Sequence, residues 1–142
     1  MATRRQCREW ALQMLFQLDL NPCDDLEALF RTFWSNQERP PSDRHRRFAE
    51  ELVAGVQSHR AQIDATIQSL AEHWDLGRMG VVDRNVLRMA LYELTYREDI
   101  PPAVTINEAV DIAKYFSNTE SGKFVNGILD RARKDLKRPA KS

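Results

Sequence analysis

The sequence predicts an all-α protein, and three observations support this fold class. The 142 residues include only five Gly and six Pro, fewer than a protein of short strands and tight turns would need. Hydrophobic residues make up 42% of the chain, enough for one domain to close a core without disulfides or metals. Apolar residues recur every three or four positions and show no strand-like alternation. We therefore expect about seven helices in a single domain over 1–142.

Four apolar stripes predict four helices in the first half of the chain. The stripes span Trp10–Leu18, Leu26–Trp34, Phe48–Val56 and Ile63–Trp74. The first helix is expected over Arg4–Leu20. The carboxylates of Asp24-Asp25 suit the start of the second helix, and Ser42-Asp43 can cap the third. We expect a break near 58–60 and a fourth helix that reaches Gly77.

The fifth predicted helix, Val81–Tyr96, differs from the others because apolar residues occupy most of its circumference. Only a narrow polar stripe remains, through Arg84, Arg88 and Tyr92. A helix with this pattern is expected to be buried on most sides.

Two more helices are predicted after Pro101-Pro102. Thr105-Ile-Asn-Glu108 has the pattern of a capping box, so the sixth helix is expected to begin there and to reach Phe116. A connector is expected over 117–122. The apolar stripe Val125–Leu136 then predicts the seventh helix.

Charge and motif content exclude several classes of function. The 21 basic and 21 acidic residues balance, so nucleic-acid binding would require local segregation of charge. Cys7 and Cys23 form no CxxC pattern, which indicates free thiols in a reducing cytoplasm. There is no eighteen-residue apolar stretch, P-loop, GxGxxG, GxSxG or zinc-ligand spacing. We therefore expect no membrane span, no cofactor, no metal and no enzymatic activity.

Basic residues gather at the start of the first helix. Arg8 follows Arg4 and Arg5 by four and three positions, so the three are expected to form one surface patch. A cation at a helix N-terminus opposes the helix dipole by about 0.3 to 1 kcal/mol. Anionic RNA would reverse that penalty. The alternative is a solubilising N-terminal tail.

Two other segments leave a choice between structural and RNA-binding roles. In Lys123-Phe-Val-Asn-Gly127, Phe124 lies about a quarter-turn from the apolar stripe. Its ring therefore suits base stacking, with Lys123 beside it for phosphate, or packing against a neighbouring helix. The basic residues of Arg44-His-Arg-Arg47 form either a solvated face or a phosphate-facing patch.

Four segments are similar to those of a known family. They are Arg4-Arg-Gln-Cys-Arg-Glu-Trp-Ala-Leu-Gln13, Asp83-Arg-Asn-Val-Leu-Arg-Met-Ala-Leu-Tyr-Glu-Leu94, Ile100-Pro101 with Asn107-Glu-Ala-Val-Asp-Ile-Ala-Lys114, and Lys123-Phe-Val-Asn-Gly-Ile-Leu-Asp130. Together they resemble the NusB family of bacterial transcription antitermination factors. The chain departs from the family where Gln6 and Cys7 interrupt the basic run and where Phe16 replaces a frequent Tyr.

The resemblance implies two small helical subdomains, roughly 1–76 and 77–138, packed across each other. It implies that the protein binds boxA-type single-stranded RNA of ribosomal RNA transcripts together with the ribosomal protein NusE. It would support processive transcription as part of the elongation complex in the cytoplasm. The implied NusE contact is Asp83, and the implied RNA contacts are Arg4, Arg5, Arg8, Lys123 and Phe124.

Two alternatives accompany this interpretation. The thinned arginine cluster also suits a helical protein-interaction adaptor without significant RNA binding of its own. NusB-like domains also occur fused to RNA cytosine methyltransferases, but we expect no enzyme because the sequence to Ser142 leaves no room for a methyl-donor domain. The sequence leaves open whether the free protein is a monomer or a homodimer.

Overall fold

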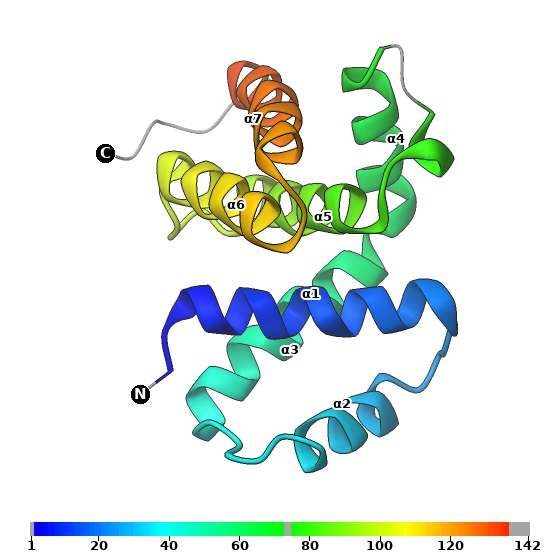
Figure 1. Cartoon of the computed structure of the whole chain (residues 1–142), viewed down its shortest axis with the longest axis vertical. Helices are drawn as coiled ribbons and strands as arrows, with labels where there is room; N and C mark the ends of the chain where they lie inside the picture. Colours follow the sequence, from blue (N-terminus) through cyan, green and yellow to red (C-terminus); the bar gives the residue numbers. More distant parts are fainter. Residues whose placement is uncertain (1, 73–74, 137–142) are drawn as a thin grey trace.

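A computed structural model describes residues 2–72 and 75–136, and every regular element in these ranges is helical (Figure 1). The elements are α1 (Arg4–Leu20), α2 (Leu26–Ser35), α3 (Asp43–Ser58), α4 (Arg60–Leu70), a 3-10 turn η1 (Leu76–Arg78), α5 (Val81–Tyr96), α6 (Pro102–Phe116) and α7 (Thr119–Lys134). The all-α prediction is confirmed. None of these helices is both long and apolar enough to span a lipid bilayer.

Helix α5 is the centre of the fold. It contacts α1, α3, α4, α6 and α7, and every residue from Asn85 to Leu94 is buried. The prediction of a helix buried on most sides is confirmed. Part of the expected polar stripe is buried as well. Arg88 is 3% exposed because its guanidinium donates to Asp64 on α4 at 2.8 Å and to Asp19 on α1 at 3.2 Å.

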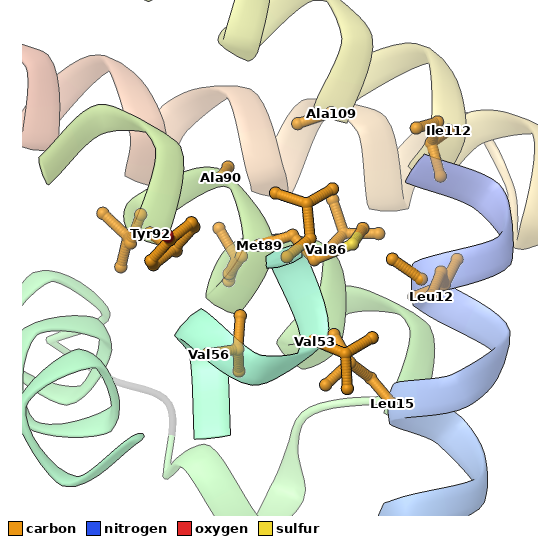
Figure 2. Packing of buried hydrophobic residues seen from close by; sticks show 14 of the residues in the cluster. Leu12, Leu15, Val53, Val56, Val86, Met89, Ala90, Tyr92, Ala109 and Ile112 are labelled. Atoms are coloured by element: carbon orange, nitrogen blue, oxygen red, sulfur yellow. The ribbon is translucent and has the colours of Figure 1, made fainter. Parts of the chain in front are cut away.

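Apolar side chains of α1, α3, α5 and α6 meet in one core (Figure 2). Figure 2 labels, among others, Leu12 and Leu15 of α1, Val53 and Val56 of α3, Val86 and Met89 of α5, and Ala109 and Ile112 of α6. Fully burying a side chain of the size of Val or Leu stabilises a fold by about 1.5 to 3 kcal/mol. This core therefore fixes α1 between α3 on one side and α5 and α6 on the other (Figure 1).

The predicted end of the fourth helix is wrong. Helix α4 ends at Leu70, and the expected end at Gly77 lies in the separate turn η1. The carboxylate of Asp75 accepts a hydrogen bond from the Gly77 N–H at 3.2 Å, which satisfies the backbone without an α-helix. Trp74, which contributed to the longer prediction, lies outside the described residues.

The predicted capping box at the start of the sixth helix is also wrong. Helix α6 begins three residues earlier, at Pro102, because a proline at the first helical position has the required backbone angle and no N–H to satisfy. The Thr105 hydroxyl is then free to donate to Glu93 of α5 at 2.8 Å. Glu108 pairs with Arg5 of α1. Both residues thus tie α6 to its neighbours.

The predicted connector over 117–122 is mostly helical. Helix α7 begins at Thr119 because the Asn118 side chain accepts a hydrogen bond from the Ser121 N–H at 2.9 Å and so caps the helix. This cap places Lys123 and Phe124 in the second turn of α7.

Helices α3 and α5 approach closely at Gly55. A Cβ atom at this position would overlap the ring of Tyr92. Tyr92 is 8% exposed, and its hydroxyl donates to Glu51 at 3.0 Å, so the ring has little room to move. Burial, together with this hydrogen bond to a carboxylate, raises the pKa of Tyr92 to about 12.

Replacing Gly55 therefore tests the packing of α3 on α5. We expect Gly55→Ala to lower the free energy of unfolding in urea by about 1 to 3 kcal/mol, because the added methyl group overpacks the contact. Gly127→Ala is the matched control, since a Cβ there meets no atom within 4 Å. It should raise stability by about 0.5 to 1 kcal/mol because Ala favours a helix interior. Stabilisation by both variants would contradict the close approach.

Candidate nucleic-acid interface

The first turn of α1 is held by a capping box that the sequence analysis missed. The Thr3 hydroxyl accepts from the Gln6 N–H at 3.1 Å, and the Gln6 side chain accepts from the Thr3 N–H at 3.0 Å. Arg4, Arg5 and Arg8 follow this cap, and successive helix positions rotate by about 100°. The three side chains consequently point in different directions: Arg4 faces α3, Arg5 faces α6 and Arg8 points into the core.

Arg8 is the arginine that points into the core. Its side chain is 4% exposed, and Glu93 of α5, its partner, is 1% exposed. Nε donates to Glu93 Oε2 at 2.7 Å and Nη2 donates to Oε1 at 2.9 Å. Thr105 donates to Oε1 from α6. The expectation that Arg8 lies on the surface beside Arg4 and Arg5 is therefore wrong, because this ion pair holds its guanidinium in the core.

Arg5 lies beside α6, with 36% of its side chain exposed. Its Nε donates to Glu108 at 2.8 Å and its Nη2 to Asp111 at 3.0 Å. The hydrogen bond with Glu108 raises the pKa of Arg5 and outweighs the opposing effect of burial, with Asp111 adding to the rise. Glu108 also lies 3.5 Å from Nη1 of Arg8, so Arg5 and Arg8 together face the three carboxylates of Glu93, Glu108 and Asp111. Arg5 therefore contributes little net positive charge to the surface.

Arg4 is exposed and faces α3. Its guanidinium carbon lies 4.6 Å from the centre of the Phe48 ring. No described carboxylate forms an ion pair with Arg4, so the ring orients the cation without neutralising it. Of the three predicted arginines, Arg4 therefore keeps the most charge for a ligand.

The other predicted residues lie where α7 begins beside α5. Phe124 and Asp83 line one hollow of about 260 Å³. Phe124 is half-buried, with part of its ring packed against the core. Lys123 is exposed, and its Nζ lies 3.5 Å from a carboxylate oxygen of Glu120 in the preceding turn. The structure thus brings the candidate stacking residue and the candidate partner residue to the same hollow.

Asp83 lies in the first turn of α5, where the helix dipole favours a carboxylate. Burial raises the pKa of Asp83, and a hydrogen bond with Ser121 of α7 offsets part of that rise. A partly desolvated carboxylate beside an aromatic ring is suited to a donor group of a protein partner.

The two clusters lie near opposite ends of α1. Arg5 is in the first turn of α1, whereas Asp19, in the last, accepts from Asn85 at 2.9 Å, two residues from Asp83 on α5. Roughly fourteen residues of helix separate Arg5 from Asp19, a rise of about 21 Å. The predicted RNA-binding residues therefore do not meet in one pocket, and a ligand that contacts both clusters must be extended.

The buried carboxylate of Asp19 joins α1 to α4 and α5, a role that the sequence analysis missed. Its side chain is 5% exposed. It accepts from four side chains: Arg60 at 2.8 Å, Asn85 at 2.9 Å, Arg84 at 3.1 Å and Arg88 at 3.2 Å. Burial raises the pKa of Asp19, but these donors and their charges outweigh burial and hold the pKa below its usual value of 3.8. One signal was present, because Asp19 follows Leu15 by four positions on the apolar face.

Comparison with known proteins identifies one family. The model of the NusB family matches residues 5–134. The transcription antitermination protein NusB of Myxococcus xanthus is 48% identical over 140 residues, which cover 98% of this chain and 100% of that protein. NusB of Desulfitobacterium hafniense DCB-2 is 48% identical over 130 residues, 91% of this chain and 86% of its own.

Solved structures agree with this result. NusB of T. maritima superimposes with a TM-score of 0.85 at 38% identity, covering 96% of this chain and 94% of its own. A chain from the crystal structure of the antitermination factors NusB and NusE in complex with double-stranded RNA has a TM-score of 0.83 at 27% identity. It covers 94% of this chain and 97% of its own.

The burial of Arg8 predicts a large difference between neighbouring arginines. Arg8→Ala should lower the free energy of unfolding by about 3 to 5 kcal/mol, because it leaves the Glu93 carboxylate buried without its cation. Arg4→Ala should change stability by no more than about 0.5 kcal/mol, because Arg4 is exposed and forms no ion pair with a described residue. Urea unfolding of both variants checks this, and equally small losses would contradict the buried pair.

The lowered pKa of Asp19 predicts a loss of stability in acid. Because the pKa is lower in the folded than in the unfolded state, the ionised carboxylate stabilises the fold fully above the unfolded value of 3.8. That contribution disappears as the pH falls through the folded value. Urea unfolding from pH 7 to pH 3 should therefore show a steeper decline for the parent than for Asp19→Asn below about pH 5. Parallel declines would contradict this role of Asp19.

Proposed function

The chain belongs to the NusB family, and on this basis we propose that it is a transcription antitermination factor that binds boxA-type RNA together with NusE. It acts on ribosomal RNA transcripts and supports processive elongation by the transcription complex in the cytoplasm. The family is one of antitermination factors and not of enzymes. The observation that carries the proposal is the similarity of almost the whole chain to a chain of the solved complex of NusB and NusE with double-stranded RNA.

The proposed RNA contacts use two kinds of interaction. Arg4 and Lys123 are exposed cations that can reach phosphates, and Arg5 can exchange part of its contact with Glu108 for a phosphate. Phe124 offers a half-buried aromatic side chain of the kind that stacks on a base. Arg4 and Arg5 lie at the start of α1, whereas Lys123 and Phe124 lie on α7 near the other end of α1, and this separation favours an extended single strand.

Arg8 has a positioning role in this proposal. Its ion pair with Glu93 fixes the N-terminal turn of α1 against α5. Arg4 and Arg5, on the same turn, are thereby held on the outside of the helix. Because this turn is already ordered, it loses less conformational entropy on binding RNA than a frayed arginine-rich helix end would lose.

The hollow between the starts of α5 and α7 is the proposed NusE-facing surface. Asp83 supplies a carboxylate and Phe124 an apolar wall. A partner seated there would lie directly beside the stacking residue. NusE and RNA would then contact adjacent surfaces of the protein, which explains why the two ligands would bind together.

A protein-interaction adaptor without significant RNA binding is the second candidate. The observation that favours it is the compensation of positive charge at the start of α1. Arg8 pairs with Glu93, and Arg5 faces both Glu108 and Asp111. An interface with so few uncompensated cations would bind RNA weakly without a partner.

Titration of a fluorescent boxA-type RNA, with and without NusE, tests the proposal. With NusE present, Phe124→Ala should weaken RNA binding about 5- to 150-fold, corresponding to about 1 to 3 kcal/mol for one lost stacking contact. The fold should lose no more than about 1.5 kcal/mol, because Phe124 is only partly buried.

Val125→Ala is the matched control for this experiment. Val125 is fully buried beside Phe124 in sequence, so its truncation should destabilise the fold more while leaving RNA affinity unchanged. If Phe124→Ala is the more destabilising variant and binds RNA like the parent, the stacking role is wrong. If the parent binds no RNA with or without NusE, the adaptor is the better description.

A further inference from the structure

A basic groove lies between the first turns of α1 and α3. It has a volume of about 500 Å³. Its wall residues come from the N-terminal turn of α1 and from the first three turns of α3: Arg4, Cys7, Arg44, His45, Arg47, Phe48 and Glu51. The groove is separate from the hollow that holds Phe124 and Asp83.

Three arginines of this groove are exposed and form no ion pair with a described residue. Within residues 2–72 and 75–136, Arg4, Arg44 and Arg47 form neither an ion pair nor a hydrogen bond. The neighbouring Arg46 behaves differently, because it pairs with Asp43 one turn earlier. The guanidinium groups that line the groove are thus the ones left for a ligand.

The acidic wall residue does not cancel this charge. Glu51 already accepts from Arg97 at 2.6 Å and from the Tyr92 hydroxyl at 3.0 Å. The Cys7 thiol on the α1 side is fully buried, and burial raises its pKa, so it adds no negative charge either. The groove therefore has an excess of positive charge over a closed apolar floor.

Phe48 forms that floor. It is 9% exposed, and its ring is already near the guanidinium carbons of Arg4 at 4.6 Å, Arg97 at 5.4 Å and Arg8 at 5.5 Å. A base cannot reach a ring that is covered in this way. The groove consequently offers a ligand its guanidinium groups and no open aromatic face.

We propose that this groove is a second phosphate-binding segment of the RNA interface, in which Arg44 and Arg47 of α3 extend the track that begins at Arg4. The inference rests on the proposed RNA-binding function. RNA is favoured over an acidic protein because the groove shares Arg4 with the proposed RNA face and because guanidinium forks match phosphate oxygens. These contacts would raise the affinity of the protein for RNA without adding sequence specificity.

The salt dependence of RNA binding tests the groove. The probe is a boxA-type RNA oligonucleotide long enough to leave flanking nucleotides, titrated in the presence of NusE from about 50 to 200 mM salt. The double variant R44A/R47A should reduce the slope of log K against log salt by about 1.4, because each lost contact with a single strand contributes about 0.7. The conservative R44K/R47K variant should retain most of the slope, because phosphate contact needs the charge.

R131A/R133A is the matched control, because it removes the same charge from two exposed arginines at the end of α7. It should leave the slope unchanged. Scrambling the bases of the flanking nucleotides should leave the effect of R44A/R47A unchanged, since the groove reads the backbone. All variants should melt at the temperature of the parent, because the altered side chains are exposed.

The outcomes separate the groove from the function on which it rests. If R44A/R47A keeps the slope of the parent while R4A lowers it, the groove proposal is wrong and the proposed function stands. If R131A/R133A lowers the slope as much as R44A/R47A, the effect is one of net charge and the groove proposal fails. If the parent binds no RNA even with NusE, both proposals are overturned.

Discussion

The buried ion pair between Arg8 and Glu93 is the constraint on which the interface depends. It joins α1 to α5, and Thr105 joins α6 to the same carboxylate. A buried ion pair adds little stability compared with apolar residues of the same size, but losing one partner is costly. Its main effect here is to fix where α1 begins relative to α5 and α6. The positions of Arg4 and Arg5 follow from that register.

A second buried cluster acts at the other end of α1. Asp19 accepts from arginines of α4 and α5 and from Asn85, close to the hollow of Asp83 and Phe124. Helix α1 is therefore held at both ends by charges buried among apolar side chains. The separation between the arginine turn and the hollow is therefore fixed by the fold, which suits the proposed binding of an extended RNA strand. The proposed groove on α3 lengthens the same track.

Much of this arrangement could be predicted from the sequence. The stripes predicted α1 over Arg4–Leu20 and α5 over Val81–Tyr96 with the bounds that the structure has, because their apolar faces are long and regular. The surroundings of charged residues could not be predicted, because they depend on partners distant in the chain. Arg8 precedes Ala11 and Leu12 by three and four positions and so lies on the buried face, yet only Glu93, 85 residues away, makes that burial tolerable. The expected division into subdomains at residue 76 stays a prediction.

Backbone NMR of the protein during titration with boxA-type RNA tests the central claim most directly. In the presence of NusE, addition of RNA should shift amide signals in three segments: 3–8 at the start of α1, 44–48 of α3 and 119–125 of α7. These segments form the proposed track. Signals of the groove at the far end of α5, which Thr66, Leu70 and Ala132 help to line, should not move. RNA-induced shifts confined to that groove, with the three segments unchanged, would contradict the account.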